Sequence, residues 1–167
     1  MTETRAVVLS AETEAAQRAE VVAQARKWLR TPYHPCGDIL GAGVDCGMLL
    51  VRAFVDAGLV TPFDPRPYPA DWMMHNDGER YLGFVDDLCG VVEEPQPGDI
   101  AVFRYGRCYS HGGVISAVGP TKIIHAYSQK RAVVEDLLSR NADLCKPARK
   151  IKYYSFWAAL HQVEQRS

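Results

Sequence analysis

The chain has 167 residues, with 19 Lys or Arg and 20 Asp or Glu, so its formal net charge is −1. This length fits one domain, residues 1–167, and a 47% hydrophobic composition can supply a core, which excludes a disordered chain. The near-neutral charge excludes nucleic acid and anionic membranes as general partners, and no apolar run reaches the ~20 residues of a membrane span. Residues 1–10 do not resemble a secretory signal peptide, so we expect cytoplasmic synthesis.

The first half of the chain predicts two helices separated by a loop. The first helix spans about 11–30, begins after the N-cap candidate Ser10 and ends before Pro32. Residues 31–45 are rich in Pro and Gly and predict the loop. The second helix spans about 46–57, and its few charged positions form one narrow stripe. A helix that is apolar on its other sides is expected to be buried and central.

The second half predicts a sheet. Residues 59–95 hold several prolines and a further helix over about 77–88, and we interpret them as an insertion. From Asp99 onward, short runs of β-branched and aromatic residues alternate with turn signals and predict about five strands: 99–103, 113–118, 121–126, 132–136 and 150–154. Helices followed by strands predict an α+β fold, with helices packed on an antiparallel sheet over about 99–155.

The five cysteines, Cys36, Cys46, Cys89, Cys108 and Cys145, do not form a disulfide or zinc pattern. Only Cys46 begins a predicted helix, directly after the N-cap candidate Asp45. The N–H groups and dipole of a helix start stabilise a thiolate, so we expect a lowered thiol pKa there. The alternative is a cysteine that only packs in the core, which is the better interpretation of the other four.

A cysteine nucleophile needs a base that a third group orients. His111 and His125 bracket a predicted hairpin, and a three-residue loop over 118–120 would place Gly113 opposite His125 and both histidines on one face. A two- or four-residue loop would put them on opposite faces. Two alternatives remain: both are ordinary strand residues, or they join Cys46 in a zinc site, for which no paired ligand spacing exists.

Four stretches, taken in order, resemble the NlpC-type cysteine peptidases of bacterial cell walls, which have a papain-like α+β core. Residues 29–33 (LRTPY) are similar to the family's entry segment, and 44–47 (VDCG) to its nucleophile motif. Residues 96–103 (QPGDIAVF) resemble the strand that opens the sheet. Residues 110–115 (SHGGVI) and 124–126 (IHA) resemble the two strands that carry the family's histidines.

The resemblance implies a nucleophile at Cys46, a general base and acid at His111, and an orienting group at His125. It implies that Tyr33 lines the site and that Asp45 binds the amino end of a cell-wall peptide; Trp72 is a candidate groove residue. The implied activity is hydrolysis of amide bonds in peptidoglycan stem peptides through a thioester, without cofactor or metal. Gly47 and Met48 replace the family's usual Ser-Gly after the nucleophile.

Residues 68–75 (YPADWMMH) are similar to a segment of phage-encoded, tail-associated members. This implies phage tail proteins as partners and a route to the cell wall on the particle. Two other functions stay open: a lipid or other acyl amidase or acyltransferase with the same Cys/His/His set, and a catalytically inactive structural component of a phage tail.

Overall fold

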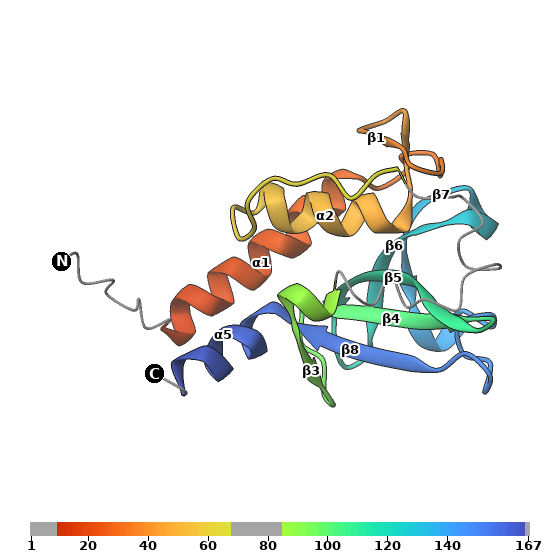
Figure 1. Cartoon of the computed structure of the whole chain (residues 1–167). Coiled ribbons are helices and arrows are strands. Elements are labelled where there is room, and N and C mark those ends of the chain that lie inside the picture. The colour runs from red at the N-terminus through yellow and green to blue at the C-terminus, as the bar shows by residue number, and fades with distance from the viewer. Residues whose placement is uncertain (1–9, 68–84, 166–167) are drawn as a thin grey trace.

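The computed structural model describes residues 10–67 and 85–165 (Figure 1). Trp72 and the phage-like segment 68–75 lie outside these residues. Most of the helix expected over 77–88 also lies outside them, and its described part, residues 85–88, is helical.

Both helices of the first half begin at the predicted N-caps. In α1 (Ala11–Lys27), the Ser10 hydroxyl accepts from the backbone N–H of Thr13 at 3.2 Å. In α2 (Cys46–Asp56), the Asp45 carboxylate accepts from the backbone N–H of Met48 at 2.9 Å. These bonds satisfy N–H groups that have no partner within the helix. The first helix ends three residues earlier than predicted, and α2 one residue earlier.

Within residues 10–67 and 85–165, the sheet is antiparallel and has six strands in the order β3-β8-β4-β5-β6-β7. Their bounds are β3 Gly90–Val92, β4 Ile100–Tyr105, β5 Cys108–Ala117, β6 Lys122–Tyr127, β7 Ala132–Leu137 and β8 Ile151–Ser155. The predicted α+β class is confirmed. The sixth strand is β3, whose three residues are too few for a pattern and lie within the expected insertion.

Five further elements of the described residues were not predicted. Two-residue strands β1 (Asp38–Ile39) and β2 (Gly43–Val44) form a small hairpin in the expected loop before α2. Asp38 of this hairpin pairs with Arg52 of α2, and 2.6 Å separates Arg52 Nε from one carboxylate oxygen. The helix α5 (Phe156–Glu164) follows β8 directly, without a side-chain cap at Ser155. Two short 3-10 helices, η1 (Ser128–Lys130) and η2 (Leu138–Arg140), flank β7.

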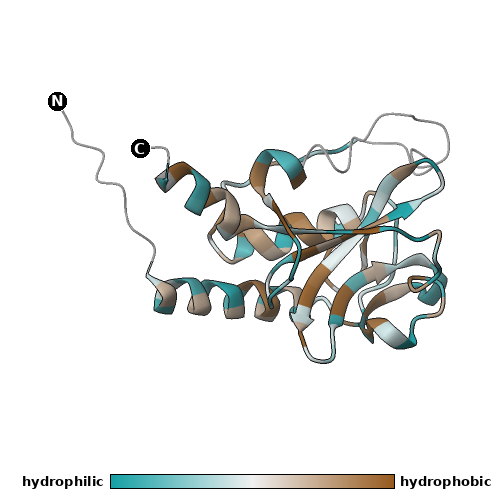
Figure 2. Cartoon of the chain, turned by 90° about the horizontal axis from the view of Figure 1, so that it is seen from below, coloured by the Kyte–Doolittle hydropathy of each residue, from teal (hydrophilic) through white to brown (hydrophobic). Residues whose placement is uncertain are grey.

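The two faces of the sheet carry two hydrophobic clusters. Val102, Val114 and Ile124 belong to a cluster with α1 and α2, which lie together on one side of the sheet (Figure 1). Phe103, Ile115 and Ile123 alternate with them and belong to a second cluster with the segment after β7. Apolar residues concentrate in the central strands, whereas α1 is largely hydrophilic (Figure 2). Packing on both faces of the central strands therefore fixes the position of α2 relative to the middle of β5.

None of the described helices is long and apolar enough to cross a membrane.

Candidate active site

Cys46 is the first residue of α2, and its sulfur lies against β5. Its Sγ is 3.8 Å from the carbonyl oxygen of Ser110, and the backbone N–H of Gly112 bonds to the sulfur. Ser110 and Gly112 are the residues on either side of His111. The half-buried nucleophile candidate therefore touches the main chain on both sides of the base candidate.

The thiol of Cys46 is protonated in this environment. Burial and the nearby Asp45 carboxylate raise the pKa of Cys46 to about 12, although backbone N–H groups of Gly112, Cys46 and Gly47 favour the thiolate. The lowered pKa expected from the helix start is therefore wrong. The reason is that the carboxylate that caps the helix lies beside the sulfur, and desolvation outweighs the N–H donors.

His111 and His125 meet directly. Nε2 of His111 lies 2.8 Å from Nδ1 of His125, and both side chains are buried, His125 completely. The predicted proximity of the two rings is confirmed, but the predicted three-residue loop is wrong. Four residues, 118–121, separate the strands, and a register shift between Ile115 and Ala117 restores the pairing that brings His125 to Gly113.

An aromatic wall encloses the histidine pair. The ring of Tyr127 stacks on His125 with centroids 4.7 Å apart, and Phe103 and Tyr105 lie 5.8 and 5.7 Å from the His111 ring. Burial lowers the pKa of His111 well below its usual value, and the neighbouring His125 lowers it further. Burial also lowers the pKa of His125. Both rings are therefore neutral at pH 7.

A carboxylate anchors the tyrosines of this wall. Asp143 accepts hydrogen bonds from the hydroxyls of Tyr105 and Tyr127 at 2.8 and 2.9 Å. Arg149 pairs with the same carboxylate at 3.0 Å, and its guanidinium lies over the Tyr105 ring. This network fixes the two rings beside His111.

Asp136 is a site residue that the sequence analysis missed. Its Oδ2 lies 3.1 Å from Nε2 of His125 and accepts from Asn141 Nδ2 at 2.9 Å, while its Oδ1 lies 2.6 Å from Nζ of Lys130. The hydrogen bond with His125 is the main cause that lowers the pKa of Asp136. The sequence did show that the predicted strand 132–136 ends in a carboxylate. Its position diagonal to His125, however, follows only from the register between β6 and β7.

Tyr33 and Asp45 both lie near Cys46. Burial raises the pKa of Tyr33, and the charges of Cys46 and Asp45 raise it further. The Tyr33 backbone forms a bridge with Val44, two residues before Cys46. Asp45 is 4% exposed and uses both carboxylate oxygens within the chain, toward the N–H of Met48 and, at 2.7 Å, that of Cys36. Asp45 thus acts as helix cap and loop anchor, and its role toward a substrate stays a prediction.

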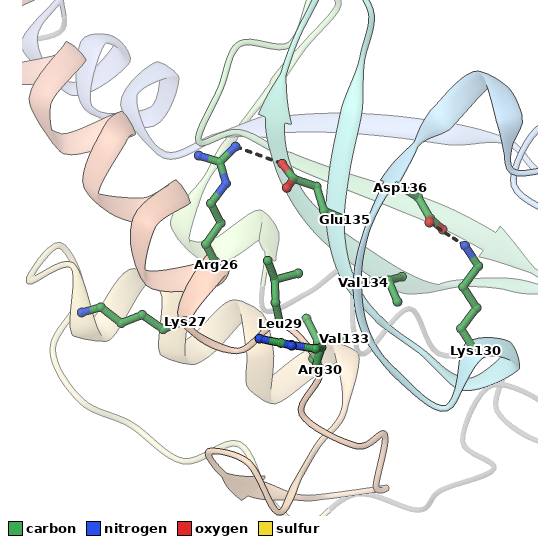
Figure 3. A pocket seen from close by; sticks show the side chains of 9 residues that line it. All are labelled: Arg26, Lys27, Leu29, Arg30, Lys130, Val133, Val134, Glu135 and Asp136. Atoms are coloured by element: carbon green, nitrogen blue, oxygen red, sulfur yellow. Dashed lines mark hydrogen bonds and ion pairs between the residues drawn. The ribbon is translucent and has the colours of Figure 1, made fainter.

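The described residues contain no group of three or more His, Cys, Asp and Glu side chains arranged to hold a metal ion. None of the five cysteines, all of which are described, forms a disulfide. A pocket of about 690 Å³ opens between the end of α1 and β7 (Figure 3). Lys130 and Asp136 line it, whereas Cys46 does not.

Several solved structures share this fold. NlpC1 from Trichomonas vaginalis aligns with a TM-score of 0.56 at 16% identity, over 82% of this chain and 42% of that one. The NlpC/p60 domain of the peptidoglycan hydrolase SagA gives 0.51 at 18% identity, over 81% and 96% of the two chains. An N-acetylmuramoyl-L-alanine amidase from Bacteroides uniformis gives 0.55 at 14% identity, over 83% and 98%.

This chain has the NlpC/p60 fold. It spans less than half of the NlpC1 chain from Trichomonas vaginalis but nearly all of the SagA domain and of the Bacteroides amidase. No protein-family model matches the sequence, and no curated protein does either. The likeness therefore lies in the NlpC/p60 architecture.

Proposed function

We propose that this protein is a cysteine peptidase that hydrolyses an amide bond of peptidoglycan stem peptides through a thioester on Cys46. One observation carries the proposal: the sulfur at the start of α2 contacts the main chain on both sides of His111, whose ring is hydrogen-bonded to His125. A nucleophile, a base and an orienting group in one place are the requirements of nucleophilic acyl transfer.

The proposed reaction begins from a neutral pair. Because the thiol is protonated and His111 is uncharged, the imidazole takes the thiol proton as the sulfur attacks the amide carbon. The oxyanion accepts from backbone N–H groups at the start of α2, including that of Cys46. His111 returns the proton to the leaving amine, and the acyl group stays on sulfur. Water, deprotonated by His111, then hydrolyses the thioester and frees Cys46.

The substrate class rests on the fold. The SagA domain that shares this architecture is called a peptidoglycan hydrolase, and the Bacteroides protein an N-acetylmuramoyl-L-alanine amidase. Both names denote enzymes of peptidoglycan. The family resemblance also supports a contact between Tyr33 and the bound peptide, and the backbone bridge between Tyr33 and Val44 is consistent with it.

The test compares two cysteine variants with the natural protein. Purified protein is incubated with peptidoglycan and with soluble muropeptides, and the products are identified by mass. We expect cleavage by the natural protein and by Cys145→Ala, which removes an exposed thiol, and no cleavage by Cys46→Ala. Cleavage by Cys46→Ala would refute the proposal.

The other two functions have distinct outcomes in the same assay. Labelling of Cys46 by an acyl donor such as a lipid ester, without peptidoglycan cleavage, would indicate a lipid or other acyl amidase or acyltransferase. Absence of both would indicate an inactive structural component.

We also propose that the protein acts at the cell wall from a phage tail. The support is the sequence of residues 68–75, which resembles phage-encoded members of the family. Purified particles of the corresponding phage should contain the protein, and its absence from them would refute this location.

A further inference from the structure

The hydrogen bonds of the site continue beyond the Cys/His/His set. His111 contacts His125 at 2.8 Å, and His125 contacts Asp136 at 3.1 Å through its other ring nitrogen. Asp136 lies on β7, diagonal to His125 on β6, and is 9% exposed. The chain of contacts therefore crosses three neighbouring strands, β5, β6 and β7.

We propose that Asp136 is a positioning residue that sets which nitrogen of each histidine carries the proton. This proposal rests on the function proposed above and extends it by one residue. Asp136 touches neither the thiol nor a substrate, and it acts only through His125.

Donor and acceptor roles fix which nitrogen of each ring carries the proton. An ionised carboxylate can only accept hydrogen bonds, so the Nε2 of His125 that faces Asp136 carries a proton. In a neutral imidazole the other nitrogen is then bare, so Nδ1 of His125 accepts from His111. Nε2 of His111 is therefore the protonated one, which leaves Nδ1 of His111 without a proton. That bare nitrogen is the form that can accept the thiol proton.

Two further donors keep Asp136 in this role. Lys130 Nζ at 2.6 Å and Asn141 Nδ2 at 2.9 Å hold its oxygens and stabilise its negative charge. Figure 3 shows Lys130 reaching Asp136, while the adjacent Glu135 bonds instead to Arg26 of α1. Since neighbouring residues of a strand point to opposite faces, Glu135 faces away from His125. Glu135 is therefore a matched control: it is a carboxylate next to Asp136 on the same strand, but it does not contact His125.

The same contacts predict what an amide would do at position 136. In Asp136→Asn, the oxygen is drawn to the Lys130 ammonium, which needs an acceptor, and the NH₂ group takes the place of Oδ2. It then faces both His125 and the Asn141 amide group, which loses its acceptor. Nε2 of His125 then becomes an acceptor, and both histidines shift their proton to Nδ1. The proton of His111 now occupies the nitrogen that must act as the base. An orienting carboxylate acts by the same logic in serine proteases, where its amide variant holds the histidine in the wrong tautomer.

The experiment reads the tautomers and the chemistry separately. Long-range ¹H–¹⁵N spectra of the natural protein should show bare Nδ1 and protonated Nε2 in both rings, with signals assigned by His111→Gln and His125→Gln. Asp136→Asn should reverse this pattern and lower kcat about 100-fold with an unchanged KM, the usual scale of losing a general base. It should also slow iodoacetamide modification of Cys46 about 10-fold or more. Glu135→Gln should change none of these quantities.

A protonated Nδ1 in either ring of the natural protein would overturn the proposal, and so would natural tautomers and an unchanged kcat in a folded Asp136→Asn protein. The spectrum of the natural protein decides even if the variant does not fold. The spectra and the alkylation need no peptidoglycan. A protein that shows the expected tautomers and alkylation rates but cuts no peptidoglycan would support the role of Asp136 and refute only the proposed function.

Discussion

Gly113 leaves the space in which the His125 side chain lies. A Cβ atom at position 113 would sit 2.8 Å from Cβ of His125 and 2.6 Å from the carbonyl oxygen of Ile124. Contacts this short are not tolerated, and one of the two atoms belongs to the backbone. The close approach of β5 and β6 at this point thus depends on glycine.

Gly113→Ala should therefore destabilise the fold and displace His125. We expect a loss of about 1–3 kcal/mol in the free energy of unfolding, the usual cost of overpacking a core. Urea denaturation measures this loss, and the cleavage rate should fall as well, since His125 moves with β6. An unchanged unfolding midpoint with unchanged activity would show that the two strands can separate without cost.

Replacements at His125 should divide according to hydrogen-bonding capacity. In His125→Gln, the side-chain oxygen can accept from His111 while the NH₂ group donates to Asp136, so the direction of both bonds is kept. His125→Leu fills similar space but leaves both neighbours without a partner. We expect His125→Gln to keep kcat within about 10-fold and His125→Leu to lose about 100-fold or more. Equal losses in the two folded variants would contradict an orienting role.

The raised pKa of Cys46 predicts an unusual alkylation profile. The thiolate is the reactive form, so the rate of iodoacetamide modification of Cys46 should still increase at pH 10, whereas that of free cysteine levels off above about pH 8.5. Modification is followed by the mass of the peptide that contains Cys46.

Asp45→Asn should shift this profile to lower pH. The variant removes a negative charge beside the sulfur, while Asn remains a good N-cap for α2. A plateau near pH 8.5 in the natural protein, or no shift in Asp45→Asn, would contradict the assigned causes.

The neutral histidines predict a loss of stability in mild acid. His111 and His125 have lowered pKa values in the folded chain, whereas in the unfolded chain they take up protons near pH 6.5. Below that pH the unfolded state binds more protons, so the free energy of unfolding falls as the pH decreases, by up to about 1.4 kcal/mol per pH unit for each histidine. Above pH 7 this contribution is fully present. Denaturation of the natural protein and of His111→Gln between pH 8 and 5 should show a shallower decrease in the variant, and equal slopes would contradict it.

The sequence predicted the α+β class and the meeting of His111 with His125, because helix caps and strand periodicity are local properties. It did not predict how the register is reached. The loop between β5 and β6 has four residues, which by simple alternation would separate the histidines. A register shift around Ser116 offsets the extra loop residue and returns the two histidines to the same face. The residue types at this position do not predict such a bulge.

Two site properties depend on tertiary placement and were missed for that reason. The thiol pKa follows from burial and from the Asp45 charge beside the sulfur, whereas the sequence showed only the helix start. Asp136 becomes a site residue only once β7 pairs with β6, which sets Asp136 opposite Ile123 and diagonal to His125. The helix α5 was not predicted either. It follows the strand β8 directly, and Ser155 at its start makes no side-chain capping bond.

The most direct test of the central claim is to find the thioester on Cys46. Protein mixed with a muropeptide is quenched in acid within the first turnovers and digested with trypsin, and the peptide 31–52, which holds both Cys36 and Cys46, is fragmented. We predict an added mass equal to the amino-terminal part of the cleaved peptide, located on Cys46, and its absence from Cys46→Ala. Cleavage without an adduct on Cys46, or an adduct on Cys36 instead, would contradict the mechanism proposed here.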